Sequence, residues 1–211
     1  IRDRSYCHGG STGGQMGLSL AERHPEMFDG IAVLYPVTNR TRLHTRFAYE
    51  RKVLDAKEYF TPEEIERVSD AIVAQNRRNA GEYRDDEYPF LKYPERATCD
   101  YSKLTFLSAE QVNVLKQIHD PVKNAKGEQV TFGLYPSAEL GDNGKSLQKG
   151  YAADWVYPMA LGEAYSVPNV NFDSDLQKVE SLFAADANAL PNLERFRQLG
   201  KKLLIIQGKL D

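Results

Sequence analysis

The stretch Tyr6-Cys7-His8-Gly9-Gly10-Ser11-Thr12-Gly13-Gly14-Gln15 decides how this chain is expected to fold. Residues 4–8 are typical of a short buried strand, and residues 15–23 have the apolar spacing of a helix. The pattern Gly9-x-Ser11-x-Gly13 between them predicts a nucleophile elbow, a strained strand-to-helix turn that exposes a serine hydroxyl. Glycines are expected on both sides of the serine, because side chains there would collide with the strand and the helix.

The residues after the elbow extend this pattern to a parallel sheet. Pro25 ends the helix, and residues 28–35 are typical of a second buried strand. Strand, elbow, helix and strand in this order predict an α/β fold with a parallel sheet. A glycine-rich turn with an ordinary serine is the alternative. A phosphate-binding loop is disfavoured, because no Gly-Lys-Ser/Thr follows.

Composition limits the partners of the chain. The sequence has 211 residues, of which 27% are charged and 41% hydrophobic, and its formal net charge is −3. This balance is typical of a soluble globular protein and predicts no binding to nucleic acid or to anionic membranes. No apolar run approaches the length that spans a bilayer, and no signal peptide is recognised at Ile1. Cys7 and Cys99 provide neither a disulfide framework nor metal-ligand spacing.

The amino-acid composition changes twice along the chain, at about residues 40 and 165. We therefore predict three zones: a core at 1–40, an insertion at 41–165 and a return to the core at 166–211. Within the insertion, Thr61-Pro62-Glu63-Glu64 and Ser108-Ala109-Glu110-Gln111 predict two helix starts with capping boxes. The stretches 81–106 and 120–150 carry little periodicity, and long loops of this kind are often functional. We interpret residues 41–165 as a cap or lid.

The third zone ends on a strand and an acidic residue. Residues 203–206, Leu-Leu-Ile-Ile, predict a buried parallel strand, which leads into Gln207-Gly208-Lys209-Leu210-Asp211. Chemistry in α/β proteins lies beyond the carboxyl ends of such strands. In the hydrolase order of serine, acid and histidine, Asp211 stands in the place of the acid. A solvated loop aspartate is the alternative.

Several ordered blocks of the chain together resemble the tannase and feruloyl esterase family of α/β-hydrolases. The resemblance implies a partial α/β-hydrolase fold, with a parallel sheet and a large inserted lid domain. It also makes Asp211 a candidate for the catalytic acid. The blocks are residues 5–15 with the elbow, Arg23-His24-Pro25, Phe28-Asp29-Gly30-Ile31, Leu107 to Val112 with Lys126-Gly127-Glu128, Phe172-Asp173, Gly200 to Leu203 and Gln207 to Asp211.

The chain departs from this family at two points. Many members carry a cysteine directly before the nucleophile, in a disulfide with a cysteine beside the catalytic histidine, whereas this chain has Gly10 there. Many members also carry a calcium loop in the lid. No such run is present here, and Asp85-Asp86-Glu87 lacks the alternating spacing that surrounds a calcium ion with oxygens. We therefore expect no cofactor, with calcium possible by resemblance only.

The resemblance also implies parts that this sequence does not contain. The family's catalytic histidine follows the aspartate, and the loop with the second oxyanion amide precedes the elbow. We therefore expect the 211 residues to be a fragment of a longer enzyme that lacks the catalytic histidine. The histidines present, which are His8, His24, His44 and His119, are expected to be structural or solvated.

The expected activity is hydrolysis of esters of phenolic or other aromatic acids, such as feruloyl or galloyl esters. Ser11 would attack the ester carbonyl, Asp211 would orient the histidine, and the amide of Thr12 would bind the oxyanion. Trp155 is a candidate for stacking on the aromatic acid, with packing inside the lid as the alternative. Arg40, with Arg42 and Arg46, is a candidate for binding a substrate carboxylate or phenolate, with a solvated basic face as the alternative.

Two other functions are compatible with the same residues. The chain could belong to another capped serine acyl hydrolase, such as a peptidase or a lipase-like enzyme. It could also be a non-catalytic binding protein on a hydrolase scaffold. The expected partner is a small aryl ester, the oligomeric state is left open, and the resemblance implies a secreted or periplasmic location.

Overall fold

The computed structural model describes residues 3–54, 57–81, 91–139, 147, 155–189 and 192–209. These residues form two compact units. The first, named here the sheet unit, lies within Ile1–Leu43 and Gln177–Lys209. The second, named here the helical unit, lies within His44–Leu176.

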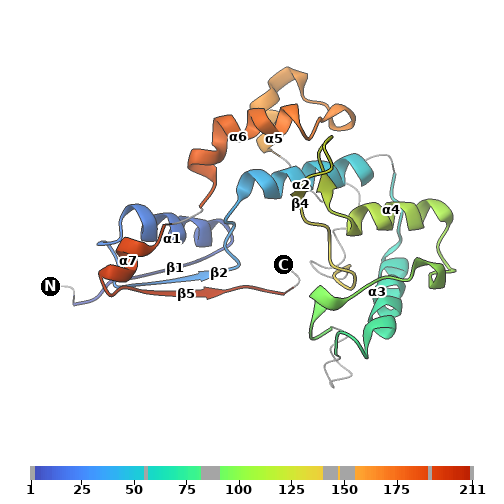
Figure 1. Cartoon of the computed structure of the whole chain (residues 1–211), viewed down its shortest axis with the longest axis horizontal. Helices are drawn as coiled ribbons and strands as arrows, with labels where there is room; N and C mark the ends of the chain where they lie inside the picture. Colours follow the sequence, from blue (N-terminus) through green and yellow to red (C-terminus); the bar gives the residue numbers. More distant parts are fainter. Residues whose placement is uncertain are drawn as a thin grey trace. The chain divides into compact units, whose positions relative to one another are not determined.

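A three-stranded parallel sheet forms the centre of the sheet unit (Figure 1). Its strands are β1 (Tyr6–Gly10), β2 (Gly30–Leu34) and β5 (Lys202–Ile206), in the order β1-β2-β5. The register pairs Gly10 with Leu34 and Leu34 with Ile206, so the carboxyl ends of all three strands meet at one edge. This arrangement confirms the predicted parallel sheet.

Two helices cover one face of this sheet. They are α1 (Thr12–Arg23) and α7 (Glu194–Gln198). Their apolar residues pack against the central strand β2, and each fully buried Leu, Val or Phe contributes about 1.5–3 kcal/mol to stability. The buried residues of this core are Leu18, Ala21, Ile31, Val33, Ala189 and Phe196.

The strands at the two sides of the sheet are more exposed than the sequence predicts. Leu204, Ile205 and Ile206 of β5 are 55%, 51% and 49% exposed, and Tyr6 of β1 is 71% exposed. The expectation that these are buried strands is therefore wrong for the described residues. The physical reason is that, in the part of the chain that the structure describes, β1 and β5 are the edge strands, and α1 and α7 pack on one face of the sheet.

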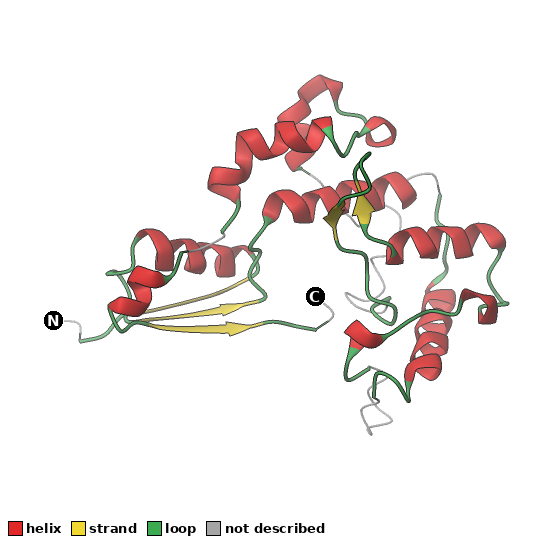
Figure 2. Cartoon of the chain, in the orientation of Figure 1, coloured by secondary structure: helices red, strands yellow, loops and turns green. Residues whose placement is uncertain are grey.

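Helices dominate the chain between β2 and β5 (Figure 2). The described α-helices there are α2 (Arg40–Leu54), α3 (Pro62–Asn76), α4 (Ala109–His119), α5 (Val156–Leu161) and α6 (Ser174–Ala187). A short antiparallel hairpin joins β3 (Val122–Lys123) and β4 (Gln129–Thr131). Single 3-10 turns lie at Pro94–Arg96, Tyr101–Lys103, Gly162–Ala164 and Val167–Asn169.

Both predicted capping boxes are confirmed. The Thr61 hydroxyl accepts a hydrogen bond from the amide of Glu64 at the start of α3, and the Glu64 carboxylate accepts one from the amide of Thr61. Ser108 and Gln111 form the same pair of bonds at the start of α4. Such caps stabilise a helix by about 0.5–2 kcal/mol each.

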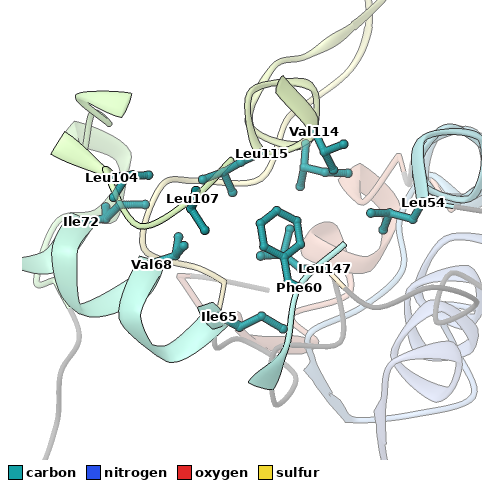
Figure 3. Packing of buried hydrophobic residues seen from close by; sticks show 11 residues of the cluster. Leu54, Phe60, Ile65, Val68, Ile72, Leu104, Leu107, Val114, Leu115 and Leu147 are labelled. Carbon is teal, nitrogen blue, oxygen red and sulfur yellow. The ribbon is translucent and has the colours of Figure 1, made fainter. Parts of the chain in front are cut away.

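The helical unit has its own hydrophobic core, shown in Figure 3. Ile65, Val68 and Ile72 of α3 are at most 2% exposed, as their helical spacing predicts. They pack with Leu115 of α4 and with apolar residues of the connecting segments. Among the helices that the structure describes, none is both long and apolar enough to cross a membrane.

Candidate active site

Ser11 occupies the turn between β1 and α1 in a backbone conformation that is rare for serine. Its φ is 53° and its ψ is −117°. Its amide donates to the Leu34 carbonyl at 3.0 Å, and its carbonyl accepts from the Gln15 amide at 3.0 Å. A non-glycine residue held in such a region costs on the order of 1–3 kcal/mol. The local backbone therefore has the strand–turn–helix form of an elbow, with an exposed serine at its turn.

The glycines beside Ser11 differ in what they allow. A Cβ atom on Gly9 would lie 2.6 Å from the carbonyl carbon and oxygen of Gly13, which is a severe overlap with backbone. A Cβ atom on Gly13 would meet no other atom within 4 Å. The predicted collision is therefore present at Gly9 and absent at Gly13, because only Gly9 faces the crossing backbone.

Thr12 begins α1 and follows Ser11 directly. The first N–H groups of a helix have no partner within the helix, and they carry its positive dipole end. The amide of Thr12 is therefore at the place where a donor to an oxyanion is expected. Its role in catalysis stays a prediction.

Arg40 lies against the first turn of α1. Its Nε and Nη2 atoms donate to Gln15 Oε1 at 3.0 and 2.6 Å, and Nη2 also donates to the Thr12 hydroxyl at 3.0 Å. The Gln15 side-chain amide in turn donates to the Ala187 carbonyl. Arg40 is 9% exposed, and burial lowers the pKa of its guanidinium, which nevertheless stays charged at neutral pH. These contacts place a buried positive charge beside Thr12.

The other two arginines of the predicted cluster have different surroundings. Arg42 forms an ion pair with Glu180 at 2.7 Å, and both side chains are about one-third exposed. Arg46 belongs to the helical unit, where it bonds Glu50 at 2.7 Å and the Ile118 carbonyl at 2.5 Å. Because Arg40 and Arg46 are buried, the alternative of a solvated basic face does not hold for these two residues.

Tyr35 lies close to Ser11, and the sequence pattern did not single it out. It follows β2 with a φ of 37°, and its amide donates to the Ile206 carbonyl at 2.6 Å. Its ring lies over Gly10, since a Cβ atom on Gly10 would be 3.0 Å from Tyr35 Cε2. The available signal is a bulky residue directly before Pro36 at the end of a strand, where backbone freedom is restricted.

The candidate acid Asp211 lies outside the described residues. Strand β5 ends at Ile206, which pairs with Leu34 of β2. The chain toward Asp211 therefore leaves the sheet at the same edge as Ser11. The pairing of Ser11 and Asp211 through a histidine stays a prediction.

Trp155 belongs to the helical unit and lies at the start of α5. Its ring contacts His44 edge to face, with 4.8 Å between the ring centroids, and the residue is 46% exposed. The indole thus has an aromatic partner in its own unit, while nearly half of the residue is accessible. Stacking on a substrate stays a prediction.

The histidines of the chain have structural or solvated surroundings, as expected. The side chain of His119 is 3% exposed and lies between the Tyr101 hydroxyl at 2.8 Å and the Glu139 carboxylate at 2.6 Å. His44 is buried beside Phe47. His8 and His24 are exposed.

No group of three or more His, Cys, Asp or Glu side chains among the described residues is arranged to hold a metal ion. The run Asp85-Asp86-Glu87 lies outside these residues. Calcium binding therefore stays an expectation from the resemblance.

The sequence of the chain is similar to that of known esterases. The family described as "Tannase and feruloyl esterase" matches residues 1–173. A "Probable feruloyl esterase B-1" of Aspergillus flavus is 26% identical over 99% of this chain and 42% of its own length. An "Uncharacterized esterase Atu5261" of Agrobacterium fabrum is 44% identical over 31% of this chain and 12% of its own length.

Solved structures share the fold. An esterase from Aspergillus oryzae superposes with a TM-score of 0.81 at 20% identity, over 99% of this chain and 44% of that one. Tannin acyl hydrolase from Aspergillus niger superposes with a TM-score of 0.71 at 20% identity, over 100% and 44%. The chain thus spans less than half the length of these structures and of the curated relatives above.

Proposed function

Since the chain belongs to the tannase and feruloyl esterase family, we propose that it carries the nucleophile of a serine carboxylic-ester hydrolase for esters of aromatic acids. The observation that carries this proposal is the backbone of Ser11. A strained, exposed serine between a parallel strand and a helix is the geometry that presents a nucleophile. Strain of this kind persists only where surrounding contacts enforce it.

The proposed reaction begins with attack of Ser11 Oγ on the ester carbonyl. A new C–O bond forms, the hydroxyl proton passes to a histidine, and the carbonyl oxygen becomes an oxyanion that accepts from the Thr12 amide. Collapse breaks the ester C–O bond, and the alcohol leaves with the proton. Water then hydrolyses the acyl-enzyme by the same steps. Asp211 is proposed to orient the histidine, which we expect downstream of it.

Arg40 is proposed to support this step without contacting the substrate, through its bonds to the first turn of α1. Its guanidinium donates to the Thr12 hydroxyl and is held by Gln15. A preorganised positive charge near the place where negative charge develops stabilises a transition state more than it would in water. These contacts support a positioning role for Arg40 more directly than contact with substrate.

The proposal has two further parts: the substrate is an ester of an aromatic acid, and the helical unit acts as a lid over it. The family and its relatives, among them a probable feruloyl esterase B-1, support the aromatic acid. The second is supported by the helical unit, which comes between β2 and β5 along the chain and has a core of its own. Trp155 remains our candidate within that unit for contact with the aromatic group.

A covalent probe tests the nucleophile. The full-length protein is treated with a fluorophosphonate, alongside Ser11→Ala and, as a matched control, Ser19→Ala from helix α1, which follows Ser11. We expect labelling of the wild type and of Ser19→Ala, and none of Ser11→Ala. A folded wild-type protein that resists the probe would contradict the proposal and favour a non-catalytic binding protein.

A substrate panel tests the acid. We expect the full-length enzyme to hydrolyse methyl ferulate or methyl gallate. Activity confined to p-nitrophenyl esters of short aliphatic acids would instead identify a different serine acyl hydrolase.

A further inference from the structure

Two strained residues meet at the carboxyl edge of the sheet. Among the described residues other than glycine, positive φ angles occur at Ser11, Tyr35 and Ser137. Ser11 and Tyr35 are neighbours in space, because the Ser11 amide donates to the carbonyl of Leu34, the residue before Tyr35. The family likeness accounts for strain at the nucleophile, whereas strain at a tyrosine beside it needs another reason.

The conformation of Tyr35 is fixed from both sides. Its amide donates to the Ile206 carbonyl of β5 at 2.6 Å, and Pro36 follows it. Gly10 provides room for its ring: a Cβ atom there would lie 3.0, 3.5 and 3.6 Å from Cε2, Cζ and the hydroxyl oxygen. The ring of Tyr35 therefore lies next to Gly10, the residue that precedes Ser11.

Tyr35 is nevertheless 47% exposed, so much of its ring is open to a ligand. Tyr6 offers an internal comparison, because its ring lies over Gly30 in the same way, 3.0 Å from a Cβ atom placed there. Tyr6 lies at the amino end of β1, whereas Tyr35 lies at the carboxyl edge with Ser11. The two tyrosines share residue type and a neighbouring glycine, but they differ in position, and only Tyr35 has a positive φ.

We propose that Tyr35 is a specificity-determining residue whose ring contacts the aromatic acyl group of an ester bound at Ser11. This inference rests on the proposed function. A planar ring gains from edge-to-face or offset contact with a second aromatic ring, and it gains less from an aliphatic chain. The hydrogen bond from the Tyr35 amide to the Ile206 carbonyl holds the backbone of this residue before substrate binds, which lowers the entropy cost of that contact.

The test compares two methyl esters in the full-length enzyme: methyl ferulate and methyl butyrate. The readout is the ratio of their kcat/KM values, which a general loss of structure would not change. We expect Tyr35→Leu to lower the ratio about 3- to 10-fold, and Tyr35→Phe to retain it. Tyr6→Leu is the matched control, and its ratio should equal that of the wild type.

Gly10→Ala gives a second route that keeps Tyr35 in place. Its added methyl group would displace the ring, so the ratio should fall in the wild-type background and change no further in Tyr35→Leu. An unchanged ratio in Tyr35→Leu, or in Gly10→Ala where Tyr35→Leu does not fold, would overturn the role of Tyr35 alone. A folded wild-type enzyme without activity on methyl ferulate would overturn the proposed aryl-ester function and the inference with it.

Discussion

Ser11 shows how single residues of this protein depend on their neighbours for their conformation. Its carbonyl accepts hydrogen bonds from the amides of Gln15 at 3.0 Å and Val37 at 3.4 Å, and its amide is bound to Leu34. Both peptide groups of the serine are therefore fixed by other segments. The strain at Ser11 is thus maintained by contacts with the helix, with β2 and with the chain after it.

The close approach of Gly9 to Gly13 leads to a prediction with a built-in control. Gly9→Ala would place a methyl group 2.6 Å from backbone atoms, and overpacking of this kind costs about 1–3 kcal/mol. Gly13→Ala would meet no neighbour within 4 Å and should be neutral or slightly stabilising. Chemical denaturation of the full-length variants measures both, and equal stabilities would contradict the expected difference.

The turn at Ser11 could be predicted from the sequence because its information is local. Gly9, Ser11 and Gly13 lie within five residues, between two segments of clear apolar pattern. The surroundings of Tyr35 and Arg40 could not be predicted in this way. Each depends on contacts with residues about 25 positions away, and the periodicity of a sequence does not show which distant residues meet in the fold.

At the scale of elements, Arg40 connects the starts of α1 and α2. It bonds both Gln15 and Thr12, so its loss should disturb the first turn of α1 where the proposed oxyanion donor lies. The same loss removes the two Arg40 hydrogen bonds to the buried Gln15 Oε1, and leaving a buried acceptor without its donor costs about 1–3 kcal/mol. Activity and stability should therefore both respond to this residue.

We predict that Arg40→Met lowers kcat by about tenfold, less than the loss typical of a direct oxyanion donor, with a smaller effect on KM. Arg40→Lys should restore part of the loss. The readout is steady-state kinetics of the full-length enzyme with methyl ferulate. Arg42→Met, in the same helix turn but paired with the partly exposed Glu180, is the control. A change in KM with constant kcat would point instead to direct contact with substrate.

Helices and strands could be predicted where their sequence signals are short in range. The capping boxes at Thr61 and Ser108 mark α3 and α4 because their hydrogen bonds span only three residues. The strand at residues 202–206 is parallel as predicted, but its burial was not predictable. An apolar run indicates a strand that can be buried, and what covers it is decided by other parts of the fold.

At the scale of the whole molecule, Asp29 joins segments from both ends of the chain. Its Oδ2 accepts from the Ser5 amide at 2.8 Å, and its Oδ1 accepts from Lys201 Nζ at 3.1 Å. The Ser5 amide, followed by Lys201, lowers the pKa of this carboxyl from its ordinary value of 3.8. The ionised carboxylate thus holds the starts of β1, β2 and β5 together.

The lowered pKa predicts how stability responds to acid. The stabilisation from Asp29 is fully present above its unfolded pKa of 3.8, and it is lost as the pH falls through the lower folded value. Asp29→Asn should therefore be less stable at neutral pH and should lose less stability below about pH 4. Urea denaturation across this pH range measures both effects. Glu26→Gln, an exposed carboxyl nearby, is the control, and parallel pH curves for wild type and Asp29→Asn would contradict the prediction.

The division of the chain is harder to derive from sequence than the sheet. The two units meet in the chain between Leu43 and His44 and between Leu176 and Gln177, inside the continuous helices α2 and α6. Because these boundaries lie inside helices, no loop-like composition marks them in the sequence. The boundaries predicted at residues 40 and 165 follow changes in composition, and they stay predictions, as does the role of the insertion as a lid.

The pairing of Gly30 with Lys202 has a consequence for how this scaffold can vary. The neighbouring strands β2 and β5 are joined by a very long connecting segment. The entropy cost of closing such a connection grows only with the logarithm of its length. Each doubling of its length costs about 0.6 kcal/mol. Replacing the segment between Leu43 and Gln177 by a shorter or longer one should therefore destabilise the strand pairing very little. This segment is thus the natural place to exchange whole modules.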